Sequence, residues 1–196
     1  SLAISAKLFT DAAAPTFGEV SNATYNEEMD RLAKDPETSG LSEAIRMEMA
    51  QNVATTKGSI AGIGYGIFST ILNNRAGFNR MIRKATGATT KAPGIFGKLE
   101  SSLEGPGIFN LKGLPGKEKA ISIAKQVGRL SASAVEGGTE ELADEALQWA
   151  WQTLTQHGEI REEDIASERD VWDAASKIFI LGAIGGEVGH GIQAMT

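Results

Sequence analysis

The sequence predicts a mainly α-helical protein, either a helical bundle or an extended helical assembly with a long Pro/Gly loop. Three observations lead to this class. Apolar residues recur at three- and four-residue spacing in several stretches, as they do on one face of a helix. No alternating run of Val, Ile and Thr bounded by hairpin turns is present. Many of the 23 glycines lie inside apolar runs, where they are typical of close helix packing, rather than in a flexible linker.

The predicted organisation has three parts: a helical region over 1–85, a linker loop over 86–117 and a second helical region over 118–196. The linker carries a small repeat, Pro-Gly-Ile-Phe, at 93–96 and again at 106–109. A connection of about thirty residues without strong secondary structure is long for a compact domain. It is typical of a domain boundary or of a segment that lies over a partner.

Two short helices are predicted at the N-terminus, over 1–14 and 22–34. The first is weakly amphipathic and is expected to end at Pro15 and Gly18. A turn from Asp35-Pro36 to Gly40 follows the second.

The next predicted helix begins near Leu41, with Ser42 as its cap, and continues without interruption to Arg83. Its first part, 41–57, has an apolar repeat every four residues: Ile45, Met49 and Val53. Its middle part, 58–74, has no charged residue.

Glycines form a regular row in that uncharged part. Gly58, Gly62 and Gly66 are four residues apart, which leaves a smooth ridge against which a second backbone can pack closely. As a helix, the uncharged run is about 25 Å long, at the lower limit for crossing a bilayer. The two interpretations, a membrane-inserted helix and a buried helix in a soluble assembly, carry equal weight at this stage.

Three helices are predicted in the second region, over 117–130, 139–156 and 171–194. The middle one has the clearest apolar stripe, with acids and amides on the opposite face, and should end at Gly158. Asp170 is expected to cap the last one. Two further small-residue steps place helix-packing glycines there: Gly182, Gly185, Gly186 and Gly189. The helices 139–156 and 171–194 should pack on each other.

The net charge of −6 conceals a strong segregation. Between Glu48 and Glu100 there are seven bases and no acid, whereas 136–173 holds twelve acids and two bases. Such segregation indicates two faces that meet each other or two different partners. A basic surface that can contact phosphate or anionic lipid is predicted from five of the bases: Arg75, Arg80, Arg83, Lys84 and Lys91.

The residues that could carry chemistry do not form a recognisable site. The chain has no cysteine, which excludes disulfides and thiolate metal sites. Glu187 and His190 have the spacing of a di-iron motif, but no second copy exists. The carboxylates Glu136 and Glu140 fall toward an apolar side without a catalytic partner. We therefore predict no catalytic, cofactor-binding or metal-binding residue, and a protein that is not an enzyme.

A resemblance to a known family rests on three segments. They are Ala-x-Glu-Gly-x-x-Glu at 134–140, Asp-Ala-Ala at 173–175, and Gly-Ala-Ile-Gly-Gly-x-x-Gly-His at 182–190. Together they resemble a pattern in the internal virion (ejection) proteins of tailed bacteriophages. That family is long and mostly helical, is packed above the portal, and helps to conduct DNA across the host envelope. No lytic transglycosylase motif of the kind that some members carry is visible here.

The resemblance implies a structural, non-enzymatic segment located in the virion interior and, after ejection, in the host envelope. Its expected partners are further copies of the chain, other virion proteins near the portal, host membrane lipid and phage DNA. The alternative is a soluble helical interaction domain of a larger virion or multidomain protein, without membrane contact. A third reading is an enzyme domain whose catalytic residues lie outside these 196 residues.

Overall fold

The computed structural model describes residues 2–87, 113–135, 138 and 144–185, all of which are helical or in short connections. No strand occurs among these residues, so the predicted mainly α class is confirmed. The elements are α1 (Leu2–Lys34), α2 (Glu43–Gly87), α4 (Gly116–Ala134), α5 (Asp144–Gln156), the 3₁₀ turn η1 (Glu162–Asp164) and α6 (Glu168–Gly185). The proposed linker repeats, 93–96 and 106–109, lie outside the described residues.

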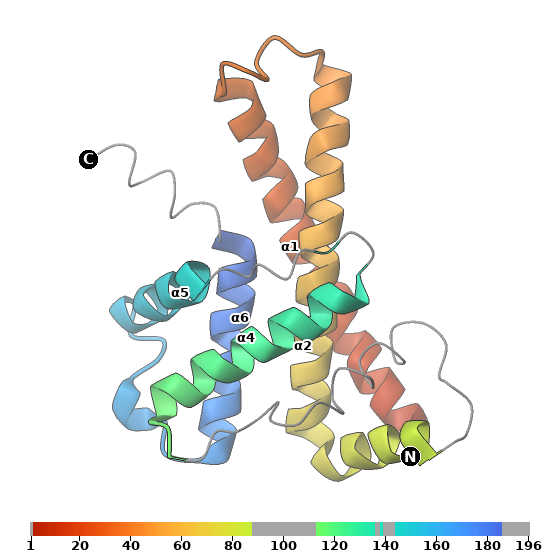
Figure 1. Cartoon of the computed structure of the whole chain (residues 1–196), viewed down its shortest axis with the longest axis vertical. Coiled ribbons are helices and arrows are strands. Elements are labelled where there is room, and N and C mark those ends of the chain that lie inside the picture. The colour runs from red at the N-terminus through yellow and green to blue at the C-terminus, as the bar shows by residue number, and fades with distance from the viewer. Residues whose placement is uncertain (1, 88–112, 136–137, 139–143, 186–196) are drawn as a thin grey trace.

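The helices α1 and α2 form a long antiparallel hairpin, and α4, α5 and α6 pack against only one end of it (Figure 1). One core joins the two predicted helical regions. Phe68 of α2 lies beside Ile123 of α4, Leu147 of α5 and Phe179 of α6 in the same fully buried cluster. Phe68 also packs on two aromatic rings of α6, with centroid separations of 6.0 Å to Trp172 and 5.8 Å to Phe179.

The apolar stripes of the second region are buried as predicted. In α4, Ala120, Ile123, Ala124 and Val127 are inaccessible to solvent. In α5, Leu147 and Ala150 are equally buried, while Gln148 and Gln152 of the opposite face are exposed. The expected contact between the last two helices is also present, because Gly182 of α6 lies against Leu147 and the Ala146 backbone. The helix α5 ends at Gln156, and Gly158 has a positive φ of 72° in the turn that follows it.

The N-terminal prediction was wrong at Pro15. The structure has a single helix from Leu2 to Lys34, with Pro15 inside it. Proline removes one helical donor and typically costs about 3 kcal/mol inside a helix. Here Pro15 is on the exposed side, while Thr16 and Val20 are buried. The packing of α1 along α2 therefore offsets the local cost of the proline.

The start of α6 was also predicted imperfectly. Ser167, rather than Asp170, precedes the first turn, and the two residues cap it reciprocally. The Ser167 amide donates to the Asp170 carboxylate at 2.7 Å, and the Asp170 amide donates to Ser167 Oγ at 3.2 Å. This is a capping box with aspartate in the position usually occupied by glutamate. The hydrogen bonds to Ser167 lower the pKa of Asp170 below its ordinary value of 3.8.

This capping box gives α6 a pH dependence. Because the folded pKa is lower than the unfolded one, the contribution of ionised Asp170 is present above the ordinary pKa and is lost as pH falls through the folded pKa. We expect Asp170→Asn to lower the melting temperature at neutral pH, and the difference from the wild type to shrink in acid. Thermal melts at both pH values test this. An equal difference at both would contradict a role for the ionised carboxylate.

Candidate interaction surface

The glycine row of α2 packs against α1 of the same chain. A Cβ on Gly62 would lie 2.9 Å from the Ala13 carbonyl oxygen and 3.1 Å from Phe17 Cβ. A Cβ on Gly66 would lie 2.7 Å from the Phe9 ring, and one on Gly58 would collide with Ser21. Ser21 Oγ also donates to the Ala54 carbonyl at 3.1 Å, a contact that joins the two helices beside this row. The second backbone at this ridge therefore belongs to the same chain.

A second face of α2 approaches the C-terminal helices. A Cβ on Gly64 would collide with the Phe179 ring and would lie 3.1 Å from Ser131 Oγ. The middle of α2 is thus enclosed on two sides, which explains why Gly58, Gly62, Gly64 and Gly66 are all buried. Gly185 is the last residue of α6, and Gly186 and Gly189 lie outside the described residues. No helix, over the residues that the structure describes, combines the length and the apolarity needed to cross a bilayer.

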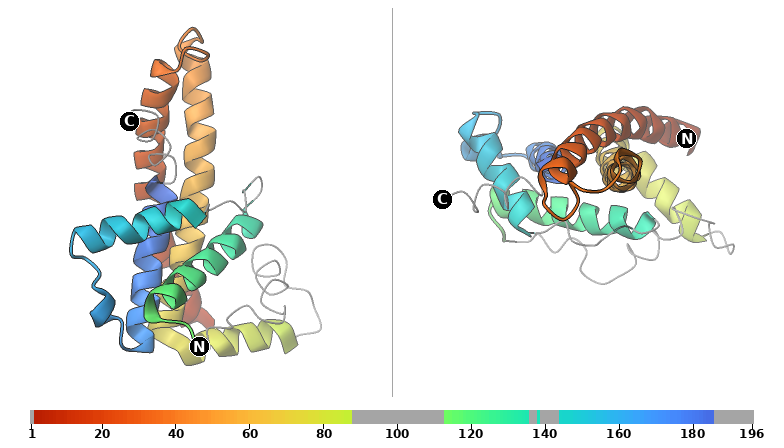
Figure 2. Two further views of the ribbon diagram at one scale, coloured as in Figure 1. Left: turned by 60° about the vertical axis from the view of Figure 1, so that its left-hand side comes forward. Right: turned by 90° about the horizontal axis from the view of Figure 1, so that it is seen from above.

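The other end of the hairpin projects from the body and forms the most distinctive surface (Figure 2). We call it the arm: the end of α1 from Val20, the turn 35–42, and the start of α2 to Val53. The contact between its two helices uses four-residue rows on both sides. On α1 the buried row is Val20, Thr24, Glu28 and Leu32, and on α2 it begins with Ala50 and Ala54.

Three large apolar side chains of the arm, all on α2, are outside this contact. Ile45, Met47 and Met49 are 46%, 45% and 38% exposed. The repeat Ile45–Met49–Val53 predicted a helix here, and the helix is present, but its first two members are not on the buried face. The buried row is alanine, because small side chains let α1 approach closely. The arm consequently exposes apolar residues that a two-helix element cannot cover by itself.

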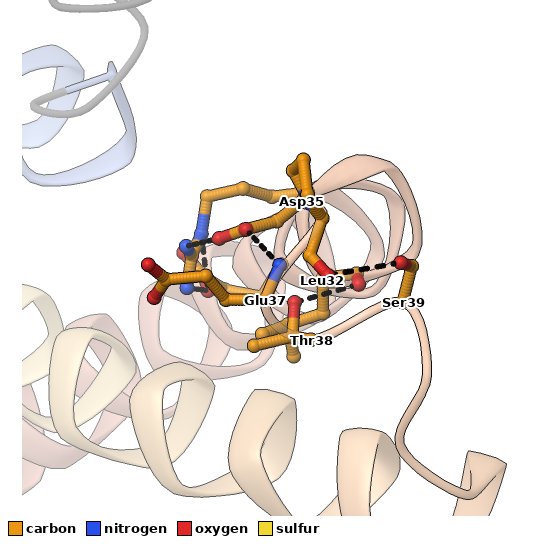
Figure 3. A network of polar contacts seen from close by, with 8 residues as sticks. Leu32, Asp35, Glu37, Thr38 and Ser39 are labelled. Carbon is orange, nitrogen blue, oxygen red and sulfur yellow. Dashed lines mark hydrogen bonds and ion pairs between the residues drawn. The ribbon is translucent and has the colours of Figure 1, made fainter.

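The tip of the arm is fixed by a network of polar contacts (Figure 3). Asp35 Oδ1 accepts the Glu37 amide at 2.9 Å, and Thr38 Oγ1 donates to the Leu32 carbonyl at 2.8 Å. In the preceding turn, Arg31 Nη2 donates at 2.8 Å to Glu28, whose side chain is only 3% exposed. These contacts hold the turn in one shape.

The cap of α2 completes the tip. The Ile45 amide donates to Ser42 Oγ at 3.4 Å, in agreement with the predicted role of Ser42. The exposed apolar side chains are therefore presented by a defined scaffold.

The charge of the arm is predominantly negative. Residues 20–53 contain seven acids and three bases, a net charge of −4. Lys34 is paired with Asp30 at 3.3 Å, and Arg31 is paired with Glu28. Glu37, Glu43 and Glu48 are exposed and form no ion pair within the part of the chain that the structure describes. Three acids without an ion pair therefore lie on the same arm as the exposed apolar side chains.

The predicted basic surface belongs to the opposite end of the same helix. Arg75, Arg80, Arg83 and Lys84 are in the last third of α2, which bends away from the line of its first part in Figure 1. Lys91 lies outside the described residues. The structure therefore places the acidic arm and the basic stretch toward opposite ends of one helix.

The residues considered for chemistry do not come together. His157 is exposed after α5, while Glu136, Glu140, Glu187 and His190 lie outside the described residues. Within the described ranges, no group of three or more His, Asp or Glu side chains could hold a metal ion. Trp151 is buried, and the ammonium group of Lys117 lies over its ring, 5.5 Å from the ring centroid.

The fold and this surface define the class of protein: it is a helical bundle with a projecting arm. The arm has two helices, is acidic and exposes apolar residues. No protein-family model, curated protein or solved structure matches the chain.

Proposed function

We propose that this chain is a structural, non-enzymatic module that acts by binding other protein chains, as a segment of an internal virion protein of a tailed bacteriophage. One observation carries the proposal: on the arm, Ile45 and Met49 are exposed on one face of α2, and Met47 is exposed on another. Exposed apolar residues grouped on a projecting element are typical of protein interfaces. The resemblance of 134–140, 173–175 and 182–190 to the phage family supplies the biological setting.

Assembly is the first consequence to test. We expect the wild-type chain to form a homo-oligomer or a stable complex, because burial of the arm removes apolar area from water. Ile45→Gln/Met49→Gln should weaken association at least tenfold in sedimentation velocity, since glutamine keeps the helix but not the apolar contact. The matched control is Gln148→Ala/Gln152→Ala on the exposed face of α5. A monodisperse, thermally stable wild-type monomer would refute the proposal.

Membrane contact separates the two versions of this function. In the ejection-protein version, the basic stretch of α2 brings the chain to anionic lipid, at about 1 kcal/mol per base. Wild type should then float with anionic vesicles at low salt, and Arg80→Gln/Arg83→Gln/Lys84→Gln should not. If wild type stays in the soluble fraction, the alternative version applies, a helical interaction domain without membrane contact. The packing of the glycine row against α1, and of Gly64 against α6, favours this alternative.

A further inference from the structure

We propose that the arm binds a basic amphipathic helix of another protein, which lies along the exposed face of the first turns of α2. The inference rests on the proposed function, because it specifies the partner that the arm recognises. Its basis is the combination, on one projecting element, of an exposed apolar face, flexible methionines and exposed acids. Together these features fit a helix that has apolar residues on one face and bases beside them.

One face of α2 is exposed from Ile45 to Asn52. Ile45, Glu48, Met49 and Asn52 have the i, i+3, i+4 and i+7 spacing of a single helix face, and all four are exposed. Helices pack by fitting the four-residue ridges of one into the grooves of the other, so this face offers a ridge to a second helix. An added strand has no equivalent place, since the described part of the chain contains no sheet edge.

Methionine is concentrated on the arm. Three of the five methionines, Met29, Met47 and Met49, lie within residues 20–53. Met47 and Met49 are exposed, and Met29 is half-buried. Because the methionine side chain is unbranched and flexible, it adapts to the shape of a partner, and surfaces that receive amphipathic helices use it for this reason.

The acids of the arm determine the sign of the partner's charge. Glu48 lies on the same face as Ile45 and Met49. Glu43 lies one turn before Met47, and both acids are exposed without an ion pair among the described residues. An apolar partner without bases would leave these carboxylates unpaired beside a poorly hydrated contact, which is unfavourable. Bases next to the apolar face of the partner would pair with them instead.

The same acids disfavour other occupants of this face. The arm has seven acids and three bases, and this net charge of −4 would repel anionic lipid and nucleic acid phosphate. A second arm can bury the same apolar side chains, but it brings Glu48 of one copy close to acids of the other. A basic amphipathic helix supplies both the apolar contact and the opposite charge.

Fluorescence anisotropy with two labelled synthetic peptides tests the inference on the full chain. Both peptides have leucine at three- and four-residue spacing, and the other positions are lysine in one and glutamate in the other. We expect the lysine peptide to bind wild type about tenfold more tightly at low salt, because its bases pair with the acids of the arm. Added salt should reduce the difference, since exposed charges are screened. Equal affinities at low salt would overturn the inference.

Matched pairs of acids locate the binding. Glu43→Gln/Glu48→Gln should remove most of the preference for the lysine peptide, with circular dichroism as the control for the fold. Glu162→Gln/Glu163→Gln removes two exposed acids from the body and should keep the preference. An equal loss in the two variants would show a nonspecific attraction to an acidic chain, and the inference would fail.

The variant Ile45→Gln/Met49→Gln separates the inference from the proposed function. We expect it to lose both self-association in sedimentation velocity and binding of the lysine peptide. If it loses self-association alone, the peptide binds elsewhere: the inference fails and the proposed function stands. If wild type neither self-associates nor binds the peptide, both fail.

Discussion

Replacing Gly62 with leucine should destabilise the fold by about 3 kcal/mol or more, since overpacking a closed contact by a few atoms already costs 1–3 kcal/mol. The new side chain would begin 2.9 Å from the Ala13 carbonyl oxygen and 3.1 Å from Phe17 Cβ. Neither is the free end of a flexible side chain, so α1 and α2 must separate. Urea unfolding followed by circular dichroism at 222 nm, the helix signal, measures the loss of stability.

Gly18→Ala is the matched control for this substitution. Gly18 is also inside a helix, but a Cβ there would meet nothing within 4 Å. Alanine is favoured over glycine in a helix by about 1 kcal/mol, so this variant should be slightly more stable than wild type. If Gly62→Leu were as stable as wild type, the close approach of α1 to the glycine row would be wrong.

Replacing Phe68 with alanine should cost about 3–5 kcal/mol, the usual range for a buried aromatic residue. Phe68 is fully buried and is the largest side chain that α2 contributes to the core shared with α6. All three tryptophans, Trp149, Trp151 and Trp172, belong to α5 and α6. Their fluorescence therefore reports whether a substitution in the first helical region changes the stability of the second.

We expect the tryptophan-monitored and helix-monitored unfolding transitions of Phe68→Ala to shift together. Met47→Ala, at an exposed position of the same helix, should stay within about 0.5 kcal/mol of wild type. A tryptophan transition that does not move, with an early loss of helix signal, would show that the predicted regions 1–85 and 118–196 unfold as separate domains.

Most of the helices, and one of the two predicted caps, could be predicted from sequence. The stripes of α4 and α5, the cap at Ser42 and the turn after Asp35 follow from local spacing and turn chemistry. In the first part of α2, the small residues Ala50 and Ala54 extend the glycine row, and this row is the one that packs on α1, because small residues permit the closer approach. Local spacing shows the apolar repeat Ile45–Met49 as well, but it does not show that this repeat stays exposed, since only the partner helix decides which face is buried.

The interaction surface was only partly predictable for the same reason. The bases of 75–91 and the absence of acids around them are properties of the sequence. The arm, in contrast, exists because α1 continues through Pro15 and pairs with α2 beyond the end of the body. Helix propensities predict that this helix ends at the proline. They therefore cannot show that residues 20–53 project together, or that the acids of the arm are remote from the bases.

Amide hydrogen exchange of the full chain, compared at low and high protein concentration, tests the central claim most directly. Our account predicts slower exchange at high concentration for the first turns of α2, 43–53, with α4 and α6, which pack in the body, unchanged. Protection confined to other segments, or exchange independent of concentration across 43–53, would contradict an interaction surface on the arm.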